Sequence, residues 1–335
     1  MLRKLIVVIV ALALLWGGYW WGVAAAVNAA LGNWADMRRS EGWSVAMSDP
    51  QQSGYPAAVK TQISTMSLAR IDGRTALAIP EIALNVPLSA PLSPTMLLPA
   101  QSVTITSPNV SARLDIEGAQ VKMALKPSRL AEVQQITLNM APWQIARSGR
   151  PLLSSQGTVA AMVQNPDNDR IYAFNVDVDG LTLAELMRQN LRLPPAWPET
   201  FETLELQMTV AFDRPFDRRS QPGDRPQPRR IELERAAATW GAIDLLASAD
   251  LTVDTSGTPE GTLSLRADNW KAILDMLQAT RIFDPRLRDQ IENTLGLVAG
   301  LSGSSDTLDI EITFADGRMS IGFFPLGPAP KIILR

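Results

Sequence analysis

The chain of 335 residues contains no cysteine and no histidine. Without cysteine it has no disulfide, no thiolate nucleophile and no cysteine metal site. Without histidine it lacks the commonest general base and the commonest transition-metal ligand. The sequence also has no glycine-rich phosphate loop and no Gly-x-Ser-x-Gly motif. We therefore predict that the protein is not an enzyme and has no catalytic residue, no metal site and no cofactor.

Charge is also scarce. Only 19% of the residues are charged and the formal net charge is −3, whereas 46% are hydrophobic. A mildly acidic body has no electrostatic attraction to nucleic acid, so we expect no nucleic-acid partner. The apolar fraction is large enough for a sizeable core. The absence of cysteine fits a protein of the bacterial periplasm, where unpaired thiols are oxidised.

One long apolar run stands at the N-terminus. Arg3 and Lys4 are followed by an uncharged stretch from Leu5 to Val27, which as a helix rising ~1.5 Å per residue exceeds the ~30 Å core of a bilayer. The two cations favour a cytoplasmic N-terminus, which places the body in the periplasm, on the far side of the inner membrane. The predicted anchor residues are Arg3, Lys4, Trp16, Tyr19, Trp20 and Trp21, the aromatic ones lying at the far interface.

A cleaved signal peptide is the alternative to this anchor, because residues 24–26 are three alanines of the kind that cleavage requires. The bulky aromatic cluster before them and the length of the apolar run favour retention. The helical pattern continues to about Ser40, and Gly42 suits the position after its end. The sequence thus predicts an anchor with a membrane-proximal extension at 1–42 and a body at 43–335. A weak strand–helix–strand repeat suggests two similar halves, with a boundary near residue 165.

The body alternates between apolar and polar residues. The clearest segments are Leu204–Phe212, Phe174–Asp179 and Asp309–Phe314, separated by turn signals such as Asp316-Gly317. This alternation indicates antiparallel strands with one solvated face. We predict a mainly β fold with a few helices (α+β): an N-terminal transmembrane helix, then a long curved antiparallel meander with short helices packed on its apolar face.

Three helices are predicted within the body. The first begins at a capping box formed by Thr182 and Glu185. The second is capped by Asp268 or Asn269 and carries an apolar stripe that includes Trp270 and Leu274. The third begins at Asp284-Pro285. Each apolar stripe is expected to lie against the sheet.

Several short motifs occur in a recognisable order behind the anchor. They are Gly54-Tyr55-Pro56 after a first strand starting at Trp43, Phe212–Arg218, Trp240-Gly241, Gly261–Leu265 before Asn269-Trp270, Phe314–Gly317 with Asp316 before the glycine, and Phe324–Pro330. Together they resemble the bacterial family called Domain of Unknown Function 2125 over essentially the whole chain. The resemblance implies a compartment and no activity.

The segment Ala249–Leu265 is also similar to repeats of AsmA-like envelope proteins. That resemblance implies an N-terminal anchor, long periplasmic β-sheets and, for larger relatives, movement of lipid along an apolar groove. Lipid or amphiphile handling is therefore the leading hypothesis. Its partners would be the lipid bilayer, contacted through the N-terminal helix, and a lipid or another envelope protein. The alternative is a structural or protein-interaction module without a ligand. A hydrolase with paired carboxylates ranks third.

Three candidate features remain open. The pairs Asp177 with Asp179, Glu232 with Glu234, and Asp309 with Glu311 are acid–base pairs, ligands of a hard cation or, more simply, parts of a solvated sheet face. Gly54-Tyr55-Pro56 is either a recognition element or a turn. The arginine-rich segment 213–230 either meets anionic headgroups or an acidic partner, or forms a disordered hairpin loop.

Overall fold

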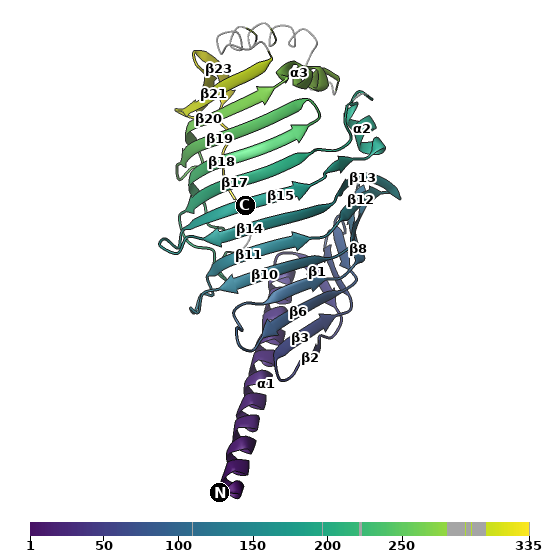
Figure 1. Ribbon diagram of the computed structural model, residues 1–335, viewed down its shortest axis with the longest axis vertical. Helices are drawn as coiled ribbons and strands as arrows, with labels where there is room; N and C mark the ends of the chain where they lie inside the picture. Colours follow the sequence, from purple (N-terminus) through teal and green to yellow (C-terminus); the bar gives the residue numbers. More distant parts are fainter. Residues whose placement is uncertain are drawn as a thin grey trace. The chain divides into compact units, whose positions relative to one another are not determined.

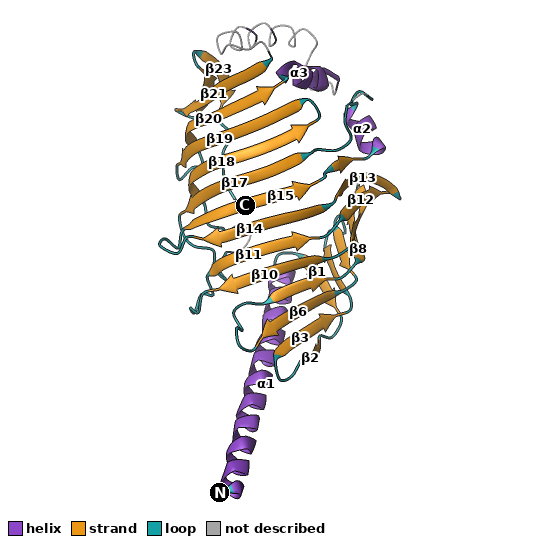
Figure 2. Ribbon diagram, viewed as in Figure 1, coloured by secondary structure: helices purple, strands orange, loops and turns teal. Residues whose placement is uncertain are grey.

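Strands dominate the fold (Figure 2). The computed structural model describes residues 1–108, 110–195, 197–220, 223–279, 292, 296 and 306–334. The chain forms two compact units: unit 1 comprises 1–125 with 145–149, and unit 2 comprises 126–144 with 150–335. The strand β12 (Trp143–Arg147) has residues in both. The prediction of two similar halves concerns internal repetition and stays a prediction.

The N-terminal helix α1 spans Leu2–Ser40 and is long and apolar enough to cross a membrane. Its continuation to Ser40 and the left-handed Gly42 after its end are both as predicted. Arg38 and Arg39 lie in the last turn, where cations stabilise the exposed carbonyls of a helix end. Figure 1 shows α1 leaving unit 1 beside β2 and β3.

Unit 1 places its strands in two antiparallel runs, ordered β1-β4-β5-β8-β9 and β2-β3-β6-β7-β10. Consecutive pairs of strands alternate between the two runs, so β2 and β3 belong to one, β4 and β5 to the other. The bounds are β1 (Trp43–Met47), β2 (Gln51–Ser53), β3 (Ala58–Ile63), β4 (Met66–Arg70), β5 (Ala76–Ile79), β6 (Ile82–Pro87), β7 (Thr95–Leu98), β8 (Gln101–Ser107), β9 (Val110–Ile116) and β10 (Ala119–Leu125).

The core of unit 1 is built on the second half of α1. Ala24 is 2% exposed and packs with Val59, Val86 and Leu88. Further along the helix, partly buried side chains lie against strands of both runs; this cluster comprises Leu31, Trp34, Met47, Ile63, Met66, Leu68, Ile79, Ile82, Met96 and Leu98. The helix therefore provides one wall of a core whose other walls are the two sheets.

Unit 2 is a meander ordered β11-β14-β15-β17-β18-β19-β20-β21-β22-β23, and β13 pairs with β16 beside it. The described strands of this meander pair antiparallel, with Phe174 opposite Met208 for example. The bounds are β11 (Val133–Met140), β13 (Arg150–Ser155), β14 (Gly157–Gln164), β15 (Ile171–Asp179), β16 (Thr182–Leu183), β17 (Thr203–Phe212), β18 (Pro228–Trp240), β19 (Ile243–Val253), β20 (Pro259–Asp268), β21 (Thr307–Ala315), β22 (Arg318–Ile321) and β23 (Phe324–Pro328).

The mainly antiparallel β fold behind an N-terminal helix is thus as predicted, and a second sheet accompanies the meander. Alternation fixes which side chains share a face of a strand, but it does not say which sheet the strand joins.

Two of the predicted helices lie in the described residues. α2 spans Glu185–Leu191, and its N-cap is Ala184 without a side-chain hydrogen bond, so the predicted capping box at Thr182 is wrong. Thr182 instead lies in the short strand β16 and pairs with Ser154 of β13. This tertiary pairing overrides the local preference of threonine for capping a helix. α3 spans Trp270–Ala279, directly after the predicted cap residues. The third predicted helix, at 284–298, has its stripe outside the described residues.

Candidate functional site

The anchor aromatics make specific contacts with unit 1. The indole of Trp16 donates a hydrogen bond to the carbonyl of Pro56 (2.9 Å), and that of Trp20 donates to Ala58 (2.8 Å). The hydroxyl of Tyr19 donates to the carbonyl of Leu88 (3.1 Å). Trp21, by contrast, is 71% exposed. The predicted interfacial role of these residues stays a prediction, and three of them also fasten the helix to unit 1.

Arg3 and Lys4 lie in the first turn of α1 and are exposed, as are the apolar residues that follow them. Nothing in unit 1 covers this part of the helix among the described residues, since the eighteen-residue hydrophobic window has no buried member. A surface of leucine, isoleucine and valine this extensive is unfavourable in water and suits the interior of a bilayer.

Gly54-Tyr55-Pro56 forms the turn between β2 and β3. Gly54 has a φ of +94°, and a Cβ at this position would lie 2.8 Å from the carbonyl oxygen of Ala58, so only glycine fits without a shift. The ring of Tyr55 meets that of Trp20 edge-on at 6.1 Å between centroids. The turn interpretation therefore has a physical basis, and the exposed half of Tyr55 leaves one face of this turn open.

The other predicted motif residues are structural parts of unit 2. Trp240 is buried, stacks on Phe201 and donates its indole N–H to the carbonyl of Pro198 (2.9 Å). Trp270 is buried against β20 and β21. Asp316 and Gly317 both have positive φ and form the two-residue turn of the β21–β22 hairpin, as Asp-Gly pairs commonly do.

The most distinctive surface of unit 2 is a row of apolar residues that crosses its strands. The row contains one residue from each of eight neighbouring strands, from β11 to β21. Each residue lies directly opposite the next one on the adjacent strand, and none of them is polar. The members are Leu138, Ala160, Val176, Leu206, Ala236, Ala247, Leu265 and Ile310. We call this row the apolar track. Its seven strand spacings of ~4.8 Å give a length of about 34 Å.

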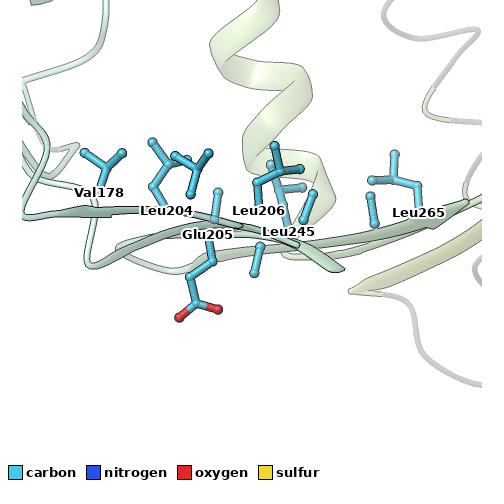
Figure 3. A pocket seen from close by; sticks show the side chains of 11 residues that line it. Val178, Leu204, Glu205, Leu206, Leu245 and Leu265 are labelled. Atoms are coloured by element: carbon cyan, nitrogen blue, oxygen red, sulfur yellow. The ribbon is translucent and has the colours of Figure 1, made fainter. Parts of the chain in front are cut away.

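A second row beside the track widens it. Leu204, Ala238 and Leu245 are register partners in β17, β18 and β19, and Val178 lies next to them. The side chains of Val178, Leu204 and Leu245 stand on one side of the sheet in Figure 3. Most members of the two rows are only partly buried.

The middle of the track is hollow because its residues there are small. Ala236, Ala238 and Ala247 form a floor between leucines on both sides, and an alanine ends at Cβ where a leucine extends two bonds further. The resulting concavity measures about 380 Å³ and is bordered by Val176, Val178, Leu204, Leu206, Leu245 and Leu265. That volume lies in the range typical of small-molecule sites.

Glu205 is the one charged residue at this concavity. Its side chain projects to the opposite side of the sheet from Leu204 and Leu206 (Figure 3). There its carboxylate accepts a hydrogen bond from the guanidinium of Arg235 (3.1 Å). The surface presented to a ligand is therefore hydrocarbon, which excludes recognition by charge.

Packed clusters limit the concavity on three sides. Trp270 and Leu274 of α3 pack over the β20–β21 end of the track. Along the strands in one direction lies an aromatic cluster around Tyr172 and Phe212. In the other direction lies the cluster around Trp240. Toward β14 and β11 the track continues through small and aliphatic residues.

The opposite side of the same strands is polar. Asp177, Asp179, Glu234, Asp309 and Glu311 are exposed there. Glu234 accepts a hydrogen bond from Thr209 (2.8 Å), and the carboxylate of Glu232 pairs with Arg230 (2.7 Å). Within the described residues, no three acidic side chains gather so as to hold a metal ion. These carboxylates have the placement of a solvated sheet face.

Three acidic side chains have displaced pKa values, and burial or hydrogen bonds within the fold account for each of them. Burial raises the pKa of Tyr172, whose hydroxyl accepts hydrogen bonds from Phe216 N–H and the Gln164 amide. The Arg219 guanidinium lowers the pKa of Asp217, which is buried. Thr258 N–H and the Ser256 hydroxyl lower that of Asp254 in the β19–β20 turn. None of the three faces the concavity.

The arginine-rich segment 213–230 is internally paired in its described part. Asp217 pairs with Arg219 (2.6 Å), and Arg214 pairs with Asp224 (2.6 Å). Arg229 pairs with Asp213 (3.3 Å). This pairing offsets much of the positive charge that a headgroup-binding role would require.

Comparison with family models gives a match over residues 20–330 to a family described as an uncharacterised protein conserved in bacteria, DUF2125. The chain belongs to this family. The match begins inside α1, at Trp20, so the part of the helix that packs in the unit 1 core is within the family's common region. No curated protein matches the chain. The resemblance of Ala249–Leu265 to AsmA-like repeats has no counterpart in these comparisons.

The alanines of the concavity are the residues that sequence reasoning missed. Residues 236–238 are three consecutive alanines inside the thirteen-residue strand β18. Because alanine is depleted in strands, such a run is a signal in itself. It becomes interpretable only with the register, which places Ala247 beside Ala236.

Proposed function

We propose that this DUF2125 protein is a membrane-anchored bacterial envelope protein that binds acyl chains on the apolar track of unit 2. The observation that carries the proposal is the alanine-floored concavity of about 380 Å³ within a continuous apolar row. A flexible hydrocarbon chain matches a long surface with no polar group to satisfy, whereas a compact polar ligand would lose its hydrogen bonds there.

The proposed topology is that of a single-pass inner-membrane protein. Arg3 and Lys4 favour a cytoplasmic N-terminus, which places both β units in the periplasm. The packing of α1 in unit 1 supports retention of the helix. Cleavage after Ala26 would remove Ala24 and the Trp20 hydrogen bond from the core of unit 1. The proposal includes no catalytic step.

Acyl-chain photo-crosslinking tests the proposal. The full chain is reconstituted in lipid nanodiscs and exposed to a fatty acid with a diazirine in its chain, and the crosslinked peptides are mapped by mass spectrometry. We expect adducts in segments 204–206, 236–247 and 263–265, besides those in α1 from the surrounding lipid. Adducts confined to α1, or crosslinks to a second protein at the track, would overturn the proposal and favour the interaction module.

A matched pair of variants sharpens the experiment. Ala247→Leu adds a bulky side chain to the floor of the concavity, so adducts around it should fall by about fivefold, because most of a ~1–2 kcal/mol contact is lost. Ser248→Leu adds the same side chain to the exposed, opposite face of β19 and should leave the adducts unchanged. Equal adduct yields in both variants would place the acyl chain elsewhere.

A further inference from the structure

The exposed part of α1 is short for a bilayer. The helix runs free of unit 1 up to Leu15, and its first hydrogen bond to unit 1 is that of Trp16 to Pro56 in the β2–β3 turn. Because Arg3 and Lys4 belong outside the hydrocarbon, the free uncharged stretch is Leu5–Leu15. Its residues at ~1.5 Å each span only about 17 Å, compared with the ~30 Å core of a typical bilayer. About 13 Å of hydrocarbon depth is thus left to the part of α1 that is already packed on unit 1.

The hydrogen bonds of α1 fix which parts of unit 1 share that depth. Trp16 is bonded to Pro56, Tyr19 to Leu88, and the carbonyl of Ala24 accepts a hydrogen bond from the Gln52 amide (2.9 Å). The β2–β3 turn and the segment after β6 therefore lie beside the helix where it emerges from unit 1, which Figure 1 shows for β2 and β3.

The composition of these two segments suits a lipid environment. No charged residue occurs between Pro50 and Val59 or between Ile82 and Ala112. Entry of these two segments into the headgroup region therefore desolvates no charge of their own. The exposed apolar and aromatic residues of α1 around Trp16, of the β2–β3 turn and of the β6–β7 loop are Trp16, Tyr19, Trp21, Tyr55 and Leu92. Half-exposed aromatic rings of this kind favour the membrane–water boundary.

We propose that unit 1 is itself a membrane-contacting surface, in which Tyr55 and Leu92 insert into the outer-leaflet interface beside α1. The occupant is lipid because the surface is continuous with the apolar helix α1 and is fixed to it by the hydrogen bonds of Trp16, Tyr19, Trp20 and Ala24. Tyr55 enters as the tip of a turn whose shape Gly54 sets, and Leu92 enters from the loop between β6 and β7. This inference rests on the membrane anchoring proposed above and is independent of the apolar track.

Single-cysteine labelling tests this surface, because the chain has no cysteine of its own. An environment-sensitive fluorophore is attached in turn at Tyr55→Cys, Leu92→Cys and Asp72→Cys in the full chain reconstituted in phosphatidylcholine–phosphatidylglycerol nanodiscs. The control site Asp72 is exposed in the β4–β5 turn, which Ile71 links to Gly42 by a backbone hydrogen bond (3.0 Å). Gly42 follows Ser40, the last residue of α1, which lies about 36 Å along the helix from Trp16, so position 72 is far from the level of Trp16.

We expect quenching by lipids with a doxyl group in the acyl chain to be at least about threefold stronger at positions 55 and 92 than at position 72. Equal, weak quenching at all three positions would overturn the inference. So would labels at 55 and 92 that are shielded from water but not quenched by lipid, since a second protein would then cover the surface. Incorporation into the nanodiscs is measured separately and reports on the anchor alone.

A charge variant supplies a second readout. In Tyr55→Asp carrying the label at position 92, we expect quenching to fall by at least about twofold, because a carboxylate is expelled from the interface. Tyr55→Trp with the same label should retain it. Circular dichroism of each variant verifies that the strands are formed. Unchanged quenching in Tyr55→Asp would show that residue 55 lies outside the membrane interface.

Discussion

The two units of this protein treat the apolar side of a β-sheet differently. In unit 1 the second half of α1 packs directly on the strands, and residues such as Val59 and Ile63 are fully buried. In unit 2 the short helix α3 packs over one end of the apolar face, and the middle of that face is a concavity floored by alanine. The first arrangement makes a sealed core and the second makes a surface that can receive a ligand.

The difference follows from the length of the covering element. A helix rises ~1.5 Å per residue and adjacent strands are ~4.8 Å apart, so a strand is crossed by about three helical residues. The ten residues of α3 reach across about three strands, whereas the apolar track crosses eight. Among the residues that the structure describes, unit 2 therefore exposes hydrocarbon wherever neither α3 nor an aromatic cluster is in contact with it.

The largest expected effect compares cavity formation in the two units. Ile63→Ala empties a fully buried position in unit 1 and should destabilise it by about 2–5 kcal/mol. Leu206→Ala, at the edge of the existing concavity, removes a partly exposed side chain and should cost about 1 kcal/mol. Hydrogen–deuterium exchange of β3 and β17 in detergent micelles measures both. Comparable losses of protection in the two strands would show that the unit 2 face is also sealed.

A smaller effect is expected from enlarging side chains on α1. Ala24→Leu places two extra bonds of side chain against Val59 and Val86, and overpacking of this kind costs about 1–3 kcal/mol. Ala25→Leu changes the exposed neighbour and should be close to neutral. Thermal unfolding followed by circular dichroism distinguishes the two variants. If Ala25→Leu were the more harmful, the packed face of the helix would be wrongly assigned.

The smallest effect concerns the segment at the aromatic end of the unit 2 face. Asp217 is buried, its carboxylate is held by Arg219, and its neighbour Phe216 packs on Tyr172 and Phe212. Asp217→Asn should destabilise this end by about 1–2 kcal/mol at neutral pH. The exposed Arg219 keeps the effect modest.

The pH dependence of that contribution has a definite sign. Because the folded-state pKa of Asp217 lies below its ordinary value of about 3.9, its stabilising contribution is complete above that value. It is lost as the pH falls through the folded-state pKa. Exchange of the 213–220 segment should therefore rise below about pH 4 in the wild-type chain but not in Asp217→Asn. A loss of protection at higher pH would point to another group.

The sequence predicts the elements of this fold better than their partners. Alternation in Leu204–Phe212 identifies the strand β17 almost to the residue, and the apolar stripe of Trp270 and Leu274 identifies α3. The second sheet was not predictable, because a strand with one apolar side looks the same whichever sheet it joins. Thr182 misled the prediction of α2 because its pairing with Ser154 is a contact between distant residues.

The sequence predicts that the candidate site is an apolar sheet face, but it does not predict where on that face the concavity lies. One-sided strands imply an apolar sheet face, but its hollow depends on three alanines from β18 and β19 that only register brings together. Likewise, the length of the apolar run indicates an anchor, yet the sequence does not show that Trp16 and Trp20 bond to Pro56 and Ala58. Both features arise from tertiary pairing, which local pattern does not encode.

The helix α1 is both apolar enough to span a membrane and part of the core of unit 1, so another transmembrane helix could not replace it. Its early residues are exposed and apolar, as the proposed contact with lipid requires, whereas Ala24 and Ala35 are buried. A transmembrane helix borrowed from another protein would hold the chain at the same membrane but would leave unit 1 without its central wall. During synthesis α1 also emerges before the strands of unit 1, so their template is in place before any of them is complete.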